Sequence, residues 1–185
     1  MASTYTSNTG IEKIGAGEQS GTWGNTTNNN LEIIDRALNG VVSLTITGNK
    51  LVTTSDGSLS DGQYKILLLT GSPGSQFNLH LDPNDQQKWF FIKNSTNAIA
   101  KVRQGPADAD ASDGSGTTVS IASGTSAIVF ADGTGSNSNV SSIPTDLLGD
   151  TTPQLGGDLD TNGQAILFGS SKWAISLDTG DNELL

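Results

Sequence analysis

The feature that most constrains the fold is residues 15–40, where a polar, glycine-rich arm leads into one short amphipathic helix. The arm carries one large aromatic side chain, Trp23, and has too little apolar surface to fold alone. We therefore expect the arm to fold against something else, either another copy of the chain or a larger assembly. This arrangement is typical of an assembly component and not of an enzyme.

The helix is expected to begin at Asn29, whose side chain can cap it, with Glu32 three residues later as in a capping box. It would end before Gly40 and would be about ten residues long, too short to be stable alone. One helical face carries three apolar residues: Leu31, Ile34 and Leu38. This stripe needs a partner, which could be a bundle around a threefold axis or the chain's own β domain.

Residues 41–134 show a strand pattern, with alternating polar and apolar residues in short runs between turn-forming residues. About eight strands at regular spacing predict a mainly β fold, an antiparallel β-sandwich or jelly roll. The most apolar run, residues 88–92, is expected to be a central strand with Trp89 in the core. The only histidine, His80, is expected to be an exposed strand residue or to lie at an interface.

Gly, Ser and Asn dominate residues 135–149, which predicts a linker. Residues 150–185 then contain two short apolar runs that have no local core to bury them. We expect these runs to begin an intertwined β shaft in which three chains share one core. Large apolar residues in segments without their own core are candidate interface anchors. Together with the helix stripe, the candidate interface residues are Trp23, Leu31, Ile34, Leu38, Phe168 and Trp173.

Composition excludes several functions. The formal net charge is −10 and the nine basic residues are scattered, so nucleic-acid binding is not expected. The chain has no cysteine, which excludes disulfides and thiolate metal sites. The N-terminal residues lack the pattern of a signal peptide, and the longest apolar run is too short to cross a bilayer. Synthesis and assembly in a host cytoplasm fit both observations.

Several acidic segments were considered as calcium sites. Residues 158–163 match the opening of an EF-hand loop, but its twelfth position is Gly169 where a bidentate Glu is required. A polar turn is the preferred interpretation. Solvated loops are preferred for two further groups: Asp108, Asp110 and Asp113, and Asp82, Asn84 and Asp85.

Residues 15–21 resemble a phosphate-binding glycine loop in their glycine content. No predicted strand precedes them and no predicted helix begins at them, although such a loop requires both. No Gly-x-Ser-x-Gly motif accompanies His80. We therefore predict no catalytic, cofactor or metal residues, and no enzymatic activity.

Two segments resemble a known family. The motifs Gly21-Thr22-Trp23-Gly24, Asn28 to Asn30 and Ile33-Ile34-Asp35 are similar to the N-terminal attachment region of bacteriophage tail fibres, especially those of marine phages. Residues 150–166 are similar to a linker motif that often precedes the shaft in such fibres. The resemblance implies a homotrimeric structural protein of the virion tail.

In that family the N-terminus docks on tail adaptor or nozzle proteins, and more distal regions reach the host receptor. The predicted parts are an attachment arm with its helix, a β-sandwich domain, a linker and a shaft-like segment: residues 1–40, 41–134, 135–149 and 150–185. A different class stays open, because the same β domain could belong to a head decoration protein or a carbohydrate-binding module. A binding module should be monomeric and should display an exposed aromatic platform. The sequence leaves a pair of carboxylates for glycoside hydrolysis open as a third alternative, but in the family that the chain resembles such activity resides in long C-terminal β-helical regions, which this sequence does not show.

Overall fold

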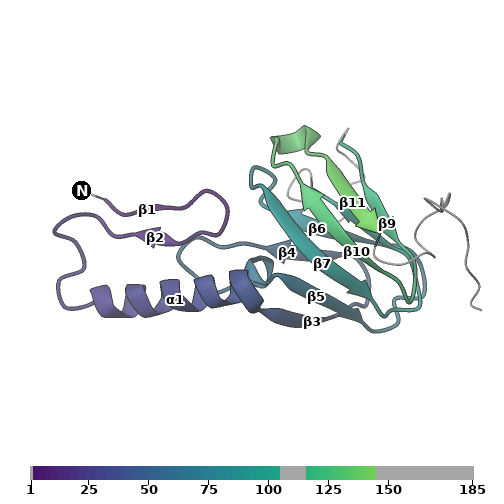
Figure 1. Cartoon of the computed structure of the whole chain (residues 1–185), viewed down its shortest axis with the longest axis horizontal. Coiled ribbons are helices and arrows are strands. Elements are labelled where there is room, and N and C mark those ends of the chain that lie inside the picture. The colour runs from purple at the N-terminus through teal and green to yellow at the C-terminus, as the bar shows by residue number, and fades with distance from the viewer. Residues whose placement is uncertain (1, 105–115, 145–185) are drawn as a thin grey trace, which may run out of the picture. The chain divides into compact units, whose positions relative to one another are not determined.

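The computed structural model describes residues 2–104 and 116–144, and the structural statements below concern those residues. They form a mainly β fold with one α-helix and two mixed β-sheets, preceded by a short N-terminal hairpin (Figure 1). The predicted mainly β class is confirmed. Two single 3-10 turns, η1 (Asp61–Gln63) and η2 (Gly135–Asn137), lie in connections between strands.

One sheet has five strands in the order β11-β10-β7-β5-β3. Strands β3, β5 and β7 are parallel to one another, whereas β7, β10 and β11 pair antiparallel. The strand bounds are β3 (Val41–Thr45), β5 (Ile66–Thr70), β7 (Lys88–Asn94), β10 (Ser126–Ala131) and β11 (Val140–Pro144).

The second sheet has four strands in the order β4-β6-β8-β9. Strands β4, β6 and β8 are parallel, and β8 pairs antiparallel with β9. The strand bounds are β4 (Lys50–Thr53), β6 (Phe77–Asp82), β8 (Ala100–Arg103) and β9 (Val119–Ile121).

The predicted antiparallel arrangement is therefore wrong for most of the domain. From β3 to β8, successive strands alternate between the two sheets, so a strand and its neighbour in the same sheet are separated by a strand of the other sheet. Each return to the first sheet can then bring the chain back in the same direction. Alternation of polar and apolar residues reports which face is buried but carries no information about strand direction.

Inward-facing side chains of both sheets form one hydrophobic core. In β5 the inward residues are Leu67 and Leu69, and in β7 they are Phe90 and Ile92, all of them fully or almost fully buried. Because successive strand residues point to opposite faces, Trp89 lies on the outer face and is 49 % exposed. The prediction that Trp89 belongs to the core is therefore wrong, because the next residue, Phe90, is the one that points inward.

His80 also differs from its prediction. It lies on the outward side of β6 between the core residues Leu79 and Leu81, yet it is fully buried. The expectation of an exposed strand residue is wrong. A buried position in a strand gives no support for a catalytic role.

Helix α1 (Trp23–Asn39) begins six residues earlier than predicted. Asn29 lies within it, and no side chain caps its N-terminus. The backbone N–H of Trp23 instead donates to the carbonyl of Gln19 at 2.9 Å. At the other end the N–H of Gly40 donates to the carbonyl of Arg36 at 3.0 Å, so the predicted C-terminus is confirmed.

The N-terminal arm folds on its own chain, as a hairpin of β1 (Thr4–Tyr5) and β2 (Glu12–Lys13). The side chain of Asn30 on α1 bonds both backbone groups of Glu12, at 3.0 and 2.8 Å. The Nε2 of Gln63 donates to the carbonyl of Thr9 at 3.3 Å, which ties the hairpin to the β domain. The partner that the arm needed is thus supplied at least in part within one chain.

Strand β11 lies inside the range that was predicted to be a linker. It forms because Asp132, at the end of β10, accepts hydrogen bonds from both the backbone and the side chain of Asn139, which closes the connection. The predicted shaft at 150–185, including Phe168, Trp173 and the turn at 158–163, lies outside the described residues, as do Asp108, Asp110 and Asp113.

Candidate assembly interface

Helix α1 has two chemically different sides. One side packs on the chain itself and includes Ile33, which is completely buried. The other side is apolar, and the described residues leave it uncovered. The exposed fractions of its large side chains are 60 % for Trp23, 58 % for Leu31, 39 % for Ile34 and 67 % for Leu38.

These four residues, all predicted from the sequence as interface residues, lie close together around the helix axis. At the roughly 100° per residue of an α-helix, the positions of Trp23, Thr27, Leu31, Ile34 and Leu38 fall within an arc of about 80°. The structure therefore brings the predicted residues of the helix into one stripe. Because the helix starts at Trp23, the tryptophan joins the same stripe.

The spacing of the stripe is that of a coiled-coil seam. Intervals of four, three and four residues connect Thr27, Leu31, Ile34 and Leu38, which places leucine at both a positions and isoleucine at the intervening d position. Such seams bury their side chains against equivalent helices. Leucine at a with a β-branched residue at d favours assemblies of more than two helices.

The polar side of α1 fixes which way the stripe faces. Asn29 donates from Nδ2 to the carbonyl of Gly57 at 2.9 Å, and Asn30 makes the two hydrogen bonds to the hairpin. The guanidinium of Arg36 lies 4.7 Å from the centre of the Tyr64 ring. These contacts hold the helix against its own chain, so the apolar stripe cannot turn inward without breaking them.

A second uncovered apolar surface lies on the outer face of the five-stranded sheet. Trp89, Phe130 and Ile143 are exposed on this face, from β7, β10 and β11. Sequence reasoning missed it. The sequence signal for this surface was that all residues in the runs 66–69 and 89–92 are apolar, which places apolar side chains on both faces of each strand. A strand that is apolar on both faces is usually covered on both.

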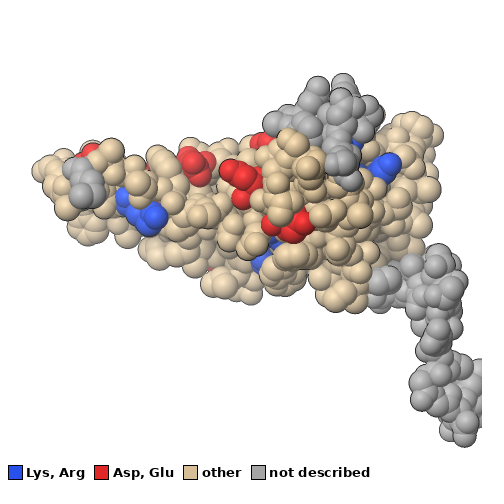
Figure 2. Space-filling view, turned by 90° about the horizontal axis from the view of Figure 1, so that it is seen from above, with Lys and Arg blue, Asp and Glu red and all other residues tan. Residues whose placement is uncertain are grey.

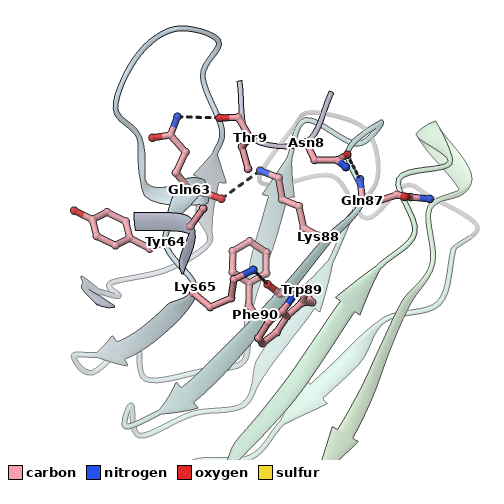
Figure 3. A pocket seen from close by; sticks show the side chains of 11 residues that line it. Asn8, Thr9, Gln63, Tyr64, Lys65, Gln87, Lys88, Trp89 and Phe90 are labelled. Atoms are coloured by element: carbon pink, nitrogen blue, oxygen red, sulfur yellow. Dashed lines mark hydrogen bonds between the residues drawn. The ribbon is translucent and has the colours of Figure 1, made fainter. Parts of the chain in front are cut away.

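A small cavity of about 150 Å³ lies where the hairpin, the end of α1 and the start of β7 meet (Figure 3). The Nζ of Lys88 donates to the carbonyl of Gly62 at 3.3 Å. Burial lowers the pKa of Lys88 to about 7, an effect that Asp82 opposes and Lys65 reinforces. The Nζ of Lys65 lies 4.1 Å from the centre of the Trp89 ring, and burial lowers its pKa as well.

The residues that line this cavity offer lysines, amides and hydroxyls but no carboxylate, so they do not include the pair of carboxylates that is typical of glycoside hydrolases. Among the residues that the structure describes, no three His, Asp or Glu side chains gather in a way that could hold a metal ion. On the side shown in Figure 2, lysine and arginine side chains appear as separate spots and not as a basic patch.

Searches of family models, curated proteins and solved structures found no match to this chain. In the described part of the chain, α1 does not have the length and apolar character needed to span a membrane. The candidate functional surface is the apolar stripe of α1, and it is identified from the structure of this chain and not from a relative.

Proposed function

We propose that this chain is a structural subunit of a virion, a bacteriophage tail fibre that assembles as a homotrimer. Residues 1–40 attach the fibre to tail adaptor or nozzle proteins. Residues 41–134 form a β-sandwich spacer, and residues 150–185 begin an intertwined shaft directed toward the host receptor. The subunit would assemble in the host cytoplasm and work as a mechanical link between the tail and the host surface.

The observation that carries the proposal is the apolar stripe of α1, which the described residues leave uncovered although they hold other sides of the helix through hydrogen bonds. Leaving Leu31 and Leu38 more than half exposed keeps a large apolar area in water. Each buried leucine is worth about 1.5–3 kcal/mol relative to exposure. Covering the same stripe on three copies recovers that energy at a single axis.

The sequence motifs support the same conclusion. The segment that resembles the tail-fibre attachment region, residues 21–35, coincides with most of α1 and its stripe. An oligomer formed by this helix would place three copies of the hairpin and of Trp23 around one axis. A tail docking on that end would meet a threefold-repeated surface.

The proposal is tested by light scattering on the purified full chain and on Leu31→Gln/Leu38→Gln. One copy has a mass of 19.1 kDa, and we expect the native chain at about three times that mass and the variant at the mass of one copy. The matched control is Asn28→Gln/Glu32→Gln, which alters exposed residues outside the stripe and should stay trimeric. A native chain that is monomeric at all concentrations would overturn the proposal.

A carbohydrate-binding module is a second candidate, because Trp89 and Phe130 are exposed and lie directly opposite each other on β7 and β10. Aromatic side chains displayed in this way can stack on sugar rings. This function predicts a monomer whose Trp89 fluorescence changes on addition of an oligosaccharide. It would be rejected if a panel of bacterial surface glycans left that fluorescence unchanged.

A further inference from the structure

A continuous row of apolar side chains crosses all five strands of the larger sheet on its outer face. The register pairs Val41 with Ile66, Ile66 with Phe91, Phe91 with Ile128, and Ile128 with Ile143. Side chains in directly opposed positions on one face are in contact range of each other. The row therefore forms one band from the edge strand β3 to the edge strand β11.

The positions beside this row extend the band. Trp89 pairs with Phe130 on one side of it, and Leu68 lies beside it in β5 on the other. The exposed fraction reaches 50 % at Val41 and 66 % at Ile143, so residues 2–104 and 116–144 leave the two edges of the band open. A contiguous uncovered apolar surface of this kind marks an interaction site.

The band also contains no carboxylate, although the chain has a net charge of −10. Two lysines lie beside the band in the described part of the chain. Lys65 lies over the Trp89 ring and Lys93 donates from Nζ to the carbonyl of Gly124. Copies of such an acidic chain repel one another where their carboxylates come close. Two copies that meet through this face would not bring carboxylates of the band together.

The outer face of the four-stranded sheet is different. Its outward positions in β6 and β8 are Asn78, His80, Asp82, Lys101 and Arg103, of which His80 and Arg103 are buried. The two sheets share one core, so the contrast is not a consequence of how the domain folds. Of the two described sheets, the five-stranded one carries the continuous apolar row.

We infer that the outer face of the five-stranded sheet is a self-contact surface, which packs against a second copy of this chain when the subunits assemble. The inference rests on the proposed oligomer. It adds that the subunits touch through their β domains as well as through α1.

A second copy is the occupant that the geometry favours, because the band begins where the helix seam ends. Leu38 is the last residue of the seam, only Asn39 and Gly40 intervene, and Val41 is the first residue of the band. Helices that associate along their seams bring their following β3 strands to the same place. The apolar faces of neighbouring β domains then lie next to the shared axis.

The absence of cysteine from the chain allows a direct test. Single cysteines are placed at the two sides of the band, as Ser43→Cys in β3 and Ser141→Cys in β11, and at the exposed Ser136 of η2 as a control. All three serines are exposed in the single chain, so none of the substitutions disturbs the core. The rate of maleimide labelling is measured for the oligomer.

The same three cysteines are also measured in the monomeric Leu31→Gln/Leu38→Gln background. We expect labelling at 43 and 141 to be slower by about tenfold or more in the oligomer, because the centre of an interface excludes solvent. Labelling at 136 should be equal in both states. All three cysteines should react alike once the helix seam is broken.

Two other outcomes are informative. If the native chain is an oligomer but residues 43 and 141 react as fast as residue 136, the self-contact inference is overturned while the proposed tail-fibre assembly stands. The band would then be free for a different partner. If the native chain is a monomer, both fail, and the solution mass identifies this case before any labelling is done.

Discussion

The two sheets pack on the same hydrophobic core but carry different side chains at their outward positions. The five-stranded sheet shows an apolar row from Val41 to Ile143, whereas the outward positions of β6 and β8 carry one amide, one histidine and charged side chains, of which His80 and Arg103 are buried. Burying the core explains one face of each sheet. It does not explain why only one sheet is apolar on both faces, and we attribute that difference to assembly.

The largest expected effect is on the dissociation of the oligomer, when a negative charge is placed on the outer face of the five-stranded sheet. Phe130→Glu puts a carboxylate in the apolar band, and we expect it to raise the dissociation constant of the oligomer by about a hundredfold, since that corresponds to about 2.7 kcal/mol. Ser120→Glu puts the same charge on the outer face of the four-stranded sheet and should change little. Light scattering over a dilution series measures both. Equal effects of the two variants would remove the distinction between the faces.

The next prediction concerns the stability of the junction that both sheets share. Asn94 donates from Nδ2 to the carbonyls of Ala98 and Ile121, at 2.8 and 2.9 Å, and accepts from the hydroxyl of Thr96 at 2.7 Å. Because Asn94→Ala removes these three hydrogen bonds, two of which are fully buried, it should lower the free energy of unfolding by about 2–4 kcal/mol in urea titrations.

Asn97→Ala removes a single exposed hydrogen bond to Gly74 and serves as the control, with an expected loss of about 0.5 kcal/mol or less. A loss for Asn94→Ala no greater than for this control would show that the junction contributes little to stability. The oligomer mass below the unfolding transition should be unchanged for both variants.

A pH-dependent effect on stability is expected from Lys88, which begins the central strand β7 close to the hairpin. Its pKa is about 7 in the folded chain and 10.5 when unfolded, so between these pH values the unfolded chain binds the extra proton. Stability should therefore rise as the pH increases from 7 toward 10.5. Lys88→Met should stabilise the fold by about 1–3 kcal/mol near pH 6 and by progressively less toward pH 10.

Urea titrations at several pH values measure this difference, with Lys101→Met on the four-stranded sheet as the matched control. If the stabilisation by Lys88→Met were the same at pH 6 and pH 10, the lysine would not be titrating within that range. The burial argument for this side chain would then be wrong.

The smallest effect is expected at the margin of the apolar band. Lys65→Met removes the cation from above the Trp89 ring and should lower the free energy of unfolding by only about 0.5–1 kcal/mol. Because methionine is apolar, self-association should be unchanged or slightly stronger. Weakened self-association would indicate that the lysine, and not the apolar surface beside it, makes the contact between copies.

The sequence predicted the eight strands between 41 and 134 and the apolar stripe of α1, because periodicity reports burial directly. It did not predict strand direction, since the alternation of strands between sheets is a tertiary property. The early start of α1 was missed because the asparagines of residues 28–30 suggested a cap, whereas Asn29 and Asn30 make tertiary hydrogen bonds from within the helix. β11 was missed because Ser and Asn around it suggest a linker.

Trp89 shows why the candidate surface could be only half predicted. The run at 88–92 is apolar throughout, so its pattern does not say which residues face inward. Only the register with β5 and β10 places Phe90 in the core and Trp89 outside. An outward aromatic then becomes evidence for a surface contact.

The most direct test of assembly through α1 is a disulfide at its seam. In Ile34→Cys any disulfide joins two copies, because the chain has no other cysteine. Mild oxidation of Ile34→Cys should rapidly give a species of twice the chain mass on a denaturing gel. Glu32→Cys, which is exposed on α1 but lies outside the apolar stripe, should stay at one chain mass. Failure of Ile34→Cys to cross-link, or equal cross-linking of both variants, would contradict the assembly that we propose.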